Sequence, residues 1–397
     1  MRRQLMRRRT KVLIASNAVA SMGWGLCWSY LNFRLYDIGA SYQQICLMDS
    51  LAAITYLTSR LWGALSDYYG RRKPFMVSGF TASALPVILM AMLNDSVWAL
   101  IWAYFGCCLA WAVAYPALMA ALTSDPRREE ATTIFTLVGN LGWALGSFMM
   151  GPADRYLGPS GVFTACLLIL LVFPLVLLFY REEPLPRKPG SPWAYARSSI
   201  SFRFKARKGF GFLLAGVFLA WFGLQWSSPL ARMRFYDLLG RSKLVMGFLW
   251  GLSSIASAVA LVTARKIVEK LGGLRTLAIS TACYAIVMPC FALIESPVAY
   301  AVLWVIPIWS FFNLGYILSP AELTEEDVRG EAMGSCEVAK NIGVFLGIFG
   351  GFTADVLDRE TSMLISAAPL SLALVPLALS WLAQKKEARA LAGQVAS

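Results

Sequence analysis

Charged side chains interrupt several apolar stretches of the sequence, at Asp49, Arg60, Glu337 and Lys340. If these stretches cross a membrane, each charge costs about 2.5 to 3.5 kcal/mol on insertion scales and should therefore serve a purpose. Arg60 lies near the end of its stretch, where its long side chain can reach the membrane surface. The other three could form ion pairs or bind and release protons.

Glu337 and Lys340 are three residues apart, so they can pair along one helix. Burial favours proton binding by Glu337 and the nearby ammonium opposes it, which would let this carboxylate bind a proton in one conformation only. Glu337 and Lys340 are therefore candidates for proton coupling, and a purely structural ion pair is the alternative. Asp49, which lies nearer the outside and alone, is the competing proton carrier.

Groups for catalysis or metal binding are scarce elsewhere. The sequence has no histidine, and its eight cysteines show no paired-ligand spacing. This argues against a zinc site and against a Ser-His or Cys-His catalytic pair. We therefore expect no catalytic residue, no metal, no cofactor and no enzyme.

A short charged segment, Gly63 to Pro74, joins two apolar stretches. So short a turn makes the two stretches a helical hairpin, and the basic triplet after Gly70 places the turn in the cytoplasm. Asp67 can lie at the N-terminus of a neighbouring helix, where the helix dipole favours a negative charge by about 0.3 to 1 kcal/mol. A solvated turn that only orients the hairpin is the alternative. The candidate gating residues are Gly63, Asp67, Gly70, Arg71 and Arg72.

The composition indicates an integral membrane protein. Hydrophobic residues make up 58% of the 397 residues, charged residues only 15%, and the mean hydropathy is +0.58. Since about 20 apolar residues cross a bilayer as a helix, we expect about twelve membrane-spanning helices and an all-α fold. The expected spans are 12–33, 44–65, 74–93, 97–121, 131–153, 162–180, 210–230, 244–264, 276–294, 298–320, 332–354 and 362–383.

The basic residues give these helices an orientation. Most of the 36 Lys and Arg residues fall in segments on one face, and the opposite loops hold few, such as Arg34, Arg232 and Lys243. The positive-inside rule then places both termini in the cytoplasm. We expect the protein in the plasma membrane. The net charge of +13 follows from this asymmetry and suits anionic inner-leaflet lipids, so it requires no nucleic acid.

Residue identities recur at a spacing of about 200. Two parallel repeats follow, and we predict domains at 1–180 and 209–397 joined by a basic cytoplasmic linker at 181–208. The part of the linker from Pro192 could be an interfacial helix with Trp193, Ile200 and Phe204 on one face, or a solvated tether. The repeated pairs include Arg34 and Arg234, Asp37 and Asp237, Asp67 and Glu269, Gly70 and Gly272, Asn140 and Asn341, Gly142 and Gly343, and Asp154 and Asp355.

Aromatic and amide side chains form stripes at helical spacing on several spans. Such stripes usually reflect packing, but aromatic faces with a few amides also suit an uncharged or amphipathic organic molecule. They do not suit a strongly anionic one. The candidate cavity residues are Trp24, Trp28, Tyr104, Trp111, Tyr115, Asn140, Gln225, Trp309, Asn313 and Tyr316.

The loop spacing and the repeat resemble the major facilitator superfamily over nearly the whole chain, except at Tyr68, where a basic residue is usual. The resemblance implies two pseudo-symmetric six-helix bundles, alternating access, and a loop at Gly63 to Pro74 that latches the cytoplasmic side. The pattern is closest to the twelve-span drug:proton antiporters, although the fifth-span glycine motif is incomplete, with Ser147 and Met150 at two of its positions.

We therefore expect a monomeric secondary transporter that exports small neutral or amphipathic organic compounds in exchange for protons. The alternatives are a facilitator or proton symporter for a neutral metabolite such as a sugar, and a non-transporting receptor or scaffold.

Overall fold

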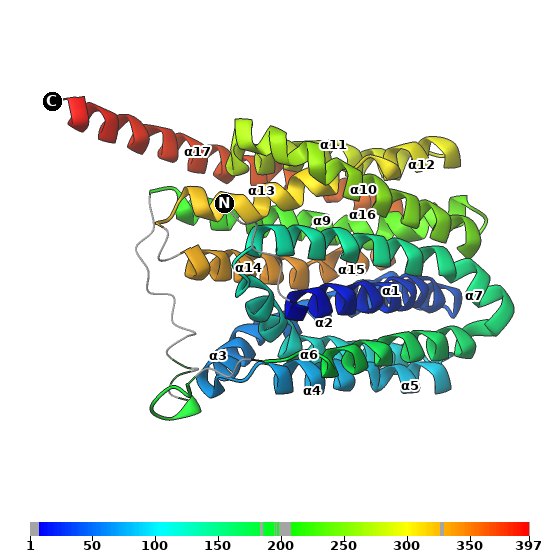
Figure 1. The fold of residues 1–397 in the computed structure, drawn as a ribbon. Helices are drawn as coiled ribbons and strands as arrows, with labels where there is room; N and C mark the ends of the chain where they lie inside the picture. Colours follow the sequence, from blue (N-terminus) through cyan, green and yellow to red (C-terminus); the bar gives the residue numbers. More distant parts are fainter. Residues whose placement is uncertain are drawn as a thin grey trace. The chain divides into compact units, whose positions relative to one another are not determined.

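The computed structural model describes residues 8–182, 186–193, 195, 197, 208–325 and 329–396, and these residues form helices and no strand (Figure 1). The interfacial helix considered for the linker includes Ile200 and Phe204, which lie outside the described residues.

The helices follow one another in two series along the chain. The first series is α1 (Arg8–Asp37), α2 (Tyr42–Leu57), α3 (Ser59–Tyr69), α4 (Lys73–Ala84), α5 (Pro86–Met92), α6 (Val97–Thr123) and α7 (Arg128–Leu178). The second series is α9 (Phe210–Leu238), α10 (Lys243–Leu271), α11 (Gly273–Leu293), α12 (Pro297–Val305), α13 (Ile308–Glu322), α14 (Arg329–Leu346), α15 (Ile348–Val356), α16 (Arg359–Ile365) and α17 (Ala367–Ala396).

Among the described residues, ten helical segments are long and apolar enough to cross a membrane. One of them, α7, turns back on itself at Gly158 (φ 66°, ψ 178°) and so supplies two antiparallel passes (Figure 1). The second expected span falls on α2 and α3, which are interrupted at Thr58 and are not among the ten. If α7 is counted as two passes and α2 with α3 as one more, the ten segments become the twelve expected spans.

Several spans that the sequence predicts as continuous are divided in two. The breaks between α4 and α5 and between α12 and α13 lie beside Pro86 and Pro307, because proline removes a backbone donor and clashes with the preceding turn. The eleventh and twelfth expected spans are divided beside Gly347 and Ser366. Broken helices of this kind occur in transporters.

The chain folds into two compact units that do not follow the order of the sequence. Unit 1 comprises residues 1–40, 55–201 and 239–255, and unit 2 comprises 41–54, 202–238 and 256–397. Each unit is thus built mainly from one half of the sequence and receives one helical segment from the other. The predicted domains at 1–180 and 209–397 follow the repeat and remain a prediction.

Equivalent glycines of the repeat allow close helix packing inside each unit. A Cβ atom on Gly142 would lie 2.4 Å from the carbonyl oxygen of Ala18, and one on Gly343 would lie 2.5 Å from that of Phe218. Both distances are below any real contact, so the α1–α7 and α9–α14 crossings each require glycine. The matching partners confirm that the repeat seen in the sequence is also a repeat of packing.

Candidate functional site

Four of the predicted cavity residues form one aromatic group in unit 1. The ring of Trp24 on α1 lies 5.7 Å from Trp111 and 6.4 Å from Tyr104 on α6, both in edge-on arrangements. Trp111 stacks on Tyr115 one turn further along, with the ring centroids 6.2 Å apart. Helical spacing therefore does place these side chains on one surface, and Trp24 Nε1 has no hydrogen-bond partner among the described residues.

Trp28 belongs to a second aromatic group in the same unit. Its ring lies 5.6 Å from Trp143 on α7 and 5.3 Å from Trp250 on α10. The segment of α10 that carries Trp250 is the one that unit 1 receives from the other half of the sequence. Asn140 lies half-buried on α7 and belongs to neither aromatic group.

In unit 2 the predicted residues Trp309 and Tyr316 meet around a third ring, Trp221 of α9. The centroid of Trp221 lies 5.5 Å from that of Trp309 and 5.9 Å from that of Tyr316, with nearly perpendicular planes. Asn313 is half-buried on the same helix, α13, between Trp309 and Tyr316. The tenth span therefore presents its stripe toward α9.

The pairing predicted for Glu337 and Lys340 is present on α14 as a short ion pair. Tyr316 donates a hydrogen bond to Glu337 Oε1 (2.8 Å). The ammonium of Lys340 lies 5.5 Å from the ring centroid of Trp221 and 5.6 Å from that of Tyr316. The two charges and the aromatic group of unit 2 are thus a single cluster.

The sequence suggested that Asp49 lies alone, but the structure gives it two polar partners. Its carboxylate lies in unit 2, where Oδ2 accepts hydrogen bonds from Arg232 Nη2 (2.6 Å) and Gln225 Nε2 (3.2 Å). We expected Arg232 in an outer loop, but α9 continues to Leu238, so Arg232 lies inside the helix and is 5% exposed. The signal in the sequence is the spacing of seven residues between Gln225 and Arg232, which puts both on one helix face.

The loop at Gly63 to Pro74 has a defined geometry within unit 1. Gly70 ends α3 in the left-handed region (φ 63°), which glycine adopts without strain. Arg72 lies 3.6 Å from Asp67 and donates to the carbonyl oxygen of Ala120 (2.8 Å) at the end of α6. Arg71 is exposed, and Gly63 faces Pro116. Arg72 thus ties the hairpin turn to α6, and Asp67 contacts Arg72 within the turn.

A carboxylate caps the helix after this loop in both halves, which the sequence did not reveal. Glu182 accepts from the backbone N–H groups of Arg72 and Lys73 at the start of α4 (the latter at 3.2 Å). Glu322 accepts from those of Gly273 and Leu274 at the start of α11 (the latter at 3.2 Å). Glu182 lies beyond the end of α7, whereas Glu322 is the last residue of α13, so only the capped ends follow the repeat.

In each unit, charged side chains bind the helical segment that comes from the other half of the sequence. In unit 1, Lys243 at the start of α10 lies 2.7 Å from Asp37 and 3.2 Å from Asp154. In unit 2, both oxygens of Asp355 accept from the first backbone N–H groups of α2, those of Tyr42 and Gln43, at 2.9 Å each. Asp154 and Asp355 are a predicted repeat pair, so this arrangement also repeats.

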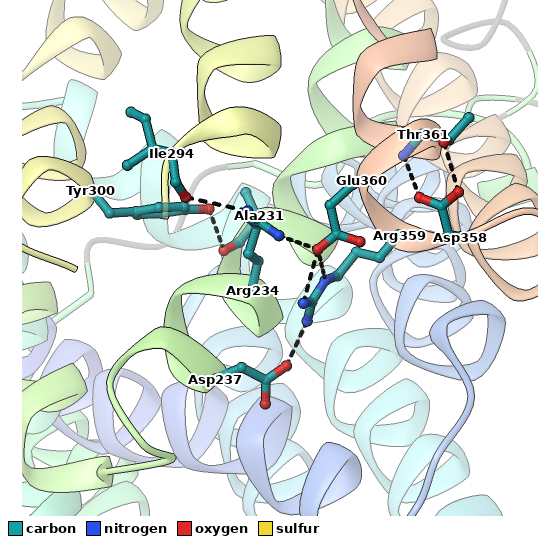
Figure 2. Close-up of polar contacts among 9 residues, drawn as sticks. All are labelled: Ala231, Arg234, Asp237, Ile294, Tyr300, Asp358, Arg359, Glu360 and Thr361. Carbon is teal, nitrogen blue, oxygen red and sulfur yellow. Dashed lines mark hydrogen bonds and ion pairs between the residues drawn. The ribbon is translucent and has the colours of Figure 1, made fainter. Parts of the chain in front are cut away.

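Figure 2 shows a charge network in unit 2 that joins the end of α9 to the start of α16. Arg359 donates to Asp237 (2.6 Å) and to Glu360, which also binds Arg234. Arg234 donates to the carbonyl oxygen of Ile294 (3.3 Å) as its repeat partner Arg34 donates to that of Asn94 (3.0 Å).

Asp358 caps the start of α16 at the edge of this network. The backbone N–H and the hydroxyl of Thr361 donate to its carboxylate, and these hydrogen bonds hold the pKa of Asp358 below its ordinary value (Figure 2).

In the described part of the chain, no group of three or more His, Cys, Asp or Glu residues could hold a metal ion.

The fold is similar to solved transporter structures. A crystal structure of the nucleoside transporter NupG matches with a TM-score of 0.72 at 14% identity, covering 94% of this chain and 99% of that one. A crystal structure of a POT family transporter in complex with 5-aminolevulinic acid matches with a TM-score of 0.78 at 13% identity, covering 96% of each chain. Identities this low show the fold alone.

No curated protein sequence matches the chain. The family model of the Major Facilitator Superfamily, however, matches residues 13–324, which is most of the chain. Together with the repeat, the geometry of the loop at Gly63 to Pro74 and the helical fold, this match shows that the chain belongs to the Major Facilitator Superfamily.

Proposed function

We propose that this protein is a secondary active transporter that works by alternating access and exports small neutral or amphipathic organic compounds in exchange for protons. The observation that carries the proposal is the cluster of Glu337, Lys340, Tyr316 and Trp221. It combines a titratable carboxylate with aromatic surface, so one site can respond to a proton and to an organic solute.

Two features of the structure favour Glu337 over Asp49 as the proton carrier. Arg232 pairs with Asp49 inside the protein, and this pair would have to break before Asp49 could be protonated. Glu337 pairs with Lys340 too, but its side chain is 39% exposed, compared with 10% for Asp49. Glu337 is therefore the carboxylate that is more accessible to a proton from solvent.

The charge distribution supports the proposed orientation. The basic residues Arg8, Arg9 and Lys11 at the start of α1 and those after Gly70 lie at helix ends that the positive-inside rule places in the cytoplasm. The networks of Lys243 and Arg359 would then face outward. We propose that each network holds the outer ends of the helices together within its own unit.

The direct test uses inverted membrane vesicles that contain the purified protein. An inside-acid pH gradient should drive accumulation of a fluorescent amphipathic dye, and collapse of the gradient should release it. Intact cells that express the protein should retain less dye than cells without it. Equal dye retention in both cell lines, with verified expression, would contradict export.

A proton symporter or facilitator for a neutral metabolite is the second candidate. It is favoured by the incomplete glycine motif of the fifth span. Ser147 and Met150 occupy positions at which proton-driven exporters usually have other residues. Uptake of labelled sugars or nucleosides by intact cells, with no effect on dye retention, would support this function over export.

A further inference from the structure

The surroundings of the Lys340 ammonium attract a positive charge from several directions. The faces of Trp221 and Tyr316 lie at 5.5 and 5.6 Å from Lys340 Nζ, which is within cation–π range for both rings. Glu337 supplies a carboxylate in direct contact, and the hydroxyl of Tyr316 fixes its other oxygen. Two aromatic faces and an anion are the elements with which proteins bind ammonium groups.

Lys340 differs from an ordinary structural lysine in where it is placed. It lies one turn from Glu337 on the same helix, so the ion pair does not link two helices. The rings of Trp221 and Tyr316 come from two other helices, α9 and α13. The side chains of Lys340 and Glu337 remain 22% and 39% exposed, and Trp309 beside Trp221 is 43% exposed. A ligand can therefore reach the cluster at these three side chains, whereas Tyr316 is buried.

We infer that Trp221, Tyr316 and Glu337 form a binding site for organic ammonium compounds, in which Lys340 is a tethered competitor. The inference rests on the proposed transport function and specifies its substrate class as amphipathic amines and quaternary ammonium compounds. An incoming ammonium displaces the Lys340 ammonium from the rings and from Glu337. An anionic ligand would instead have to take Lys340 from Glu337 while facing the same negative ring surfaces.

The test compares two ligands of the same shape that differ in charge. Choline carries a quaternary ammonium, and 3,3-dimethylbutan-1-ol is its uncharged carbon analogue. Calorimetry on the purified protein in detergent should show tighter binding of choline. Lys340→Met removes the tethered ammonium and should raise the affinity for choline by about tenfold, with no gain for the alcohol. Lys266→Met, which changes an exposed lysine of α10, should leave both affinities unchanged.

Two further variants test the site itself. Trp221→Leu and Glu337→Gln should each weaken choline binding several-fold in the Lys340→Met background, because each removes one source of attraction. A thermal unfolding curve for every variant shows whether the protein is folded. Equal affinity for choline and the alcohol in folded Lys340→Met would overturn the inference. So would a loss of choline binding in that variant.

Binding in detergent does not depend on transport, so the two proposals can fail separately. Charge-selective binding without dye or choline flux in vesicles would leave the ammonium site in place and contradict the transport function. Gradient-driven export of a neutral dye by a protein that does not distinguish choline from the alcohol would support the transport function and contradict the ammonium site.

Discussion

Arg232 and Asp49 form a buried ion pair, with 2.6 Å between Nη2 and Oδ2, although 183 residues separate them in the sequence. Neither residue is more than 9% exposed. The pair joins α2, from the first half of the sequence, to α9 of the second half within unit 2. Gln225 donates to the same carboxylate oxygen (3.2 Å).

Substituting Asp49→Asn should destabilise the protein by about 3 to 5 kcal/mol, because it breaks a buried ion pair by removing the charge of one partner. The double substitution Asp49→Leu with Arg232→Met should recover most of this loss, since it removes both charges. Thermal unfolding in detergent measures both effects. A normally stable Asp49→Asn protein that cannot use a pH gradient would instead identify Asp49 as the proton carrier.

Substituting Asp67→Asn should slow transport about two- to fivefold, since a surface ion pair such as that with Arg72 contributes about 0.2 to 1 kcal/mol. Insertion should be unchanged because the shape of the side chain is retained, and stability should fall by no more than about 1 kcal/mol. The matched control is Glu269→Gln, since Glu269 is the repeat partner of Asp67 but lacks the basic pair after its loop. Equal flux in wild type and Asp67→Asn, at equal expression, would remove the gating role.

Local patterns in the sequence predict the spans and the aromatic groups. The spacing of Trp111 and Tyr115 by four residues places both rings on one helix face, and the structure stacks them. The spacing of Glu337 and Lys340 predicts their ion pair for the same reason. Such contacts depend on helix periodicity alone, so they need no knowledge of how helices pack.

Contacts between distant segments could not be predicted in this way. Arg232 was expected in a loop because the end of α9 is uncertain by several residues, and a shift of a few positions moves the charge into the helix. Glu322 caps α11 only because the end of α13 packs beside it. The breaks at Pro86 and Pro307 were visible as prolines, but proline inside a membrane helix does not always divide it.

Substituting Lys243→Met should lower stability by about 1 to 3 kcal/mol, because Asp37 and Asp154 would lose their shared cation and face each other as like charges. Lys243→Arg should retain most of the stability. The control Lys266→Met changes an exposed lysine further along α10 and should have no effect. Thermal unfolding in detergent measures all three, and an unchanged curve for Lys243→Met would show that the network contributes nothing.

Cysteines introduced at Trp24, Trp111 and Asn313 should react with a water-soluble thiol reagent, because the proposed substrate path includes these side chains. The experiment needs a background without the eight native cysteines. Substrate should protect at least one position. Cysteine at Tyr156, which is 79% exposed, serves as the reactive control. If only the control reacts, the aromatic groups are packing and not a path.

The last prediction concerns coupling. Glu337 stands where the first half of the repeat has Thr136, and the neighbouring Asn140 and Asn341 are equivalent. At this position the second half has a titratable group and the first half has none, and the structure pairs that group with Lys340 and Tyr316. A carboxylate held by a cation in one conformation and released in another changes its proton affinity between them, which is what coupling requires.

Substituting Glu337→Gln should abolish transport driven by a pH gradient, because glutamine cannot bind a proton there. Exchange of labelled for unlabelled substrate across vesicles without a gradient should persist at saturating substrate, since exchange needs only binding and the conformational change. If the pair is purely structural, the same variant should lose stability and both activities together. Gradient-driven transport at the normal rate in Glu337→Gln would eliminate this residue as the carrier. Asp49 would then be tested in the same two assays, in the double variant that also removes Arg232.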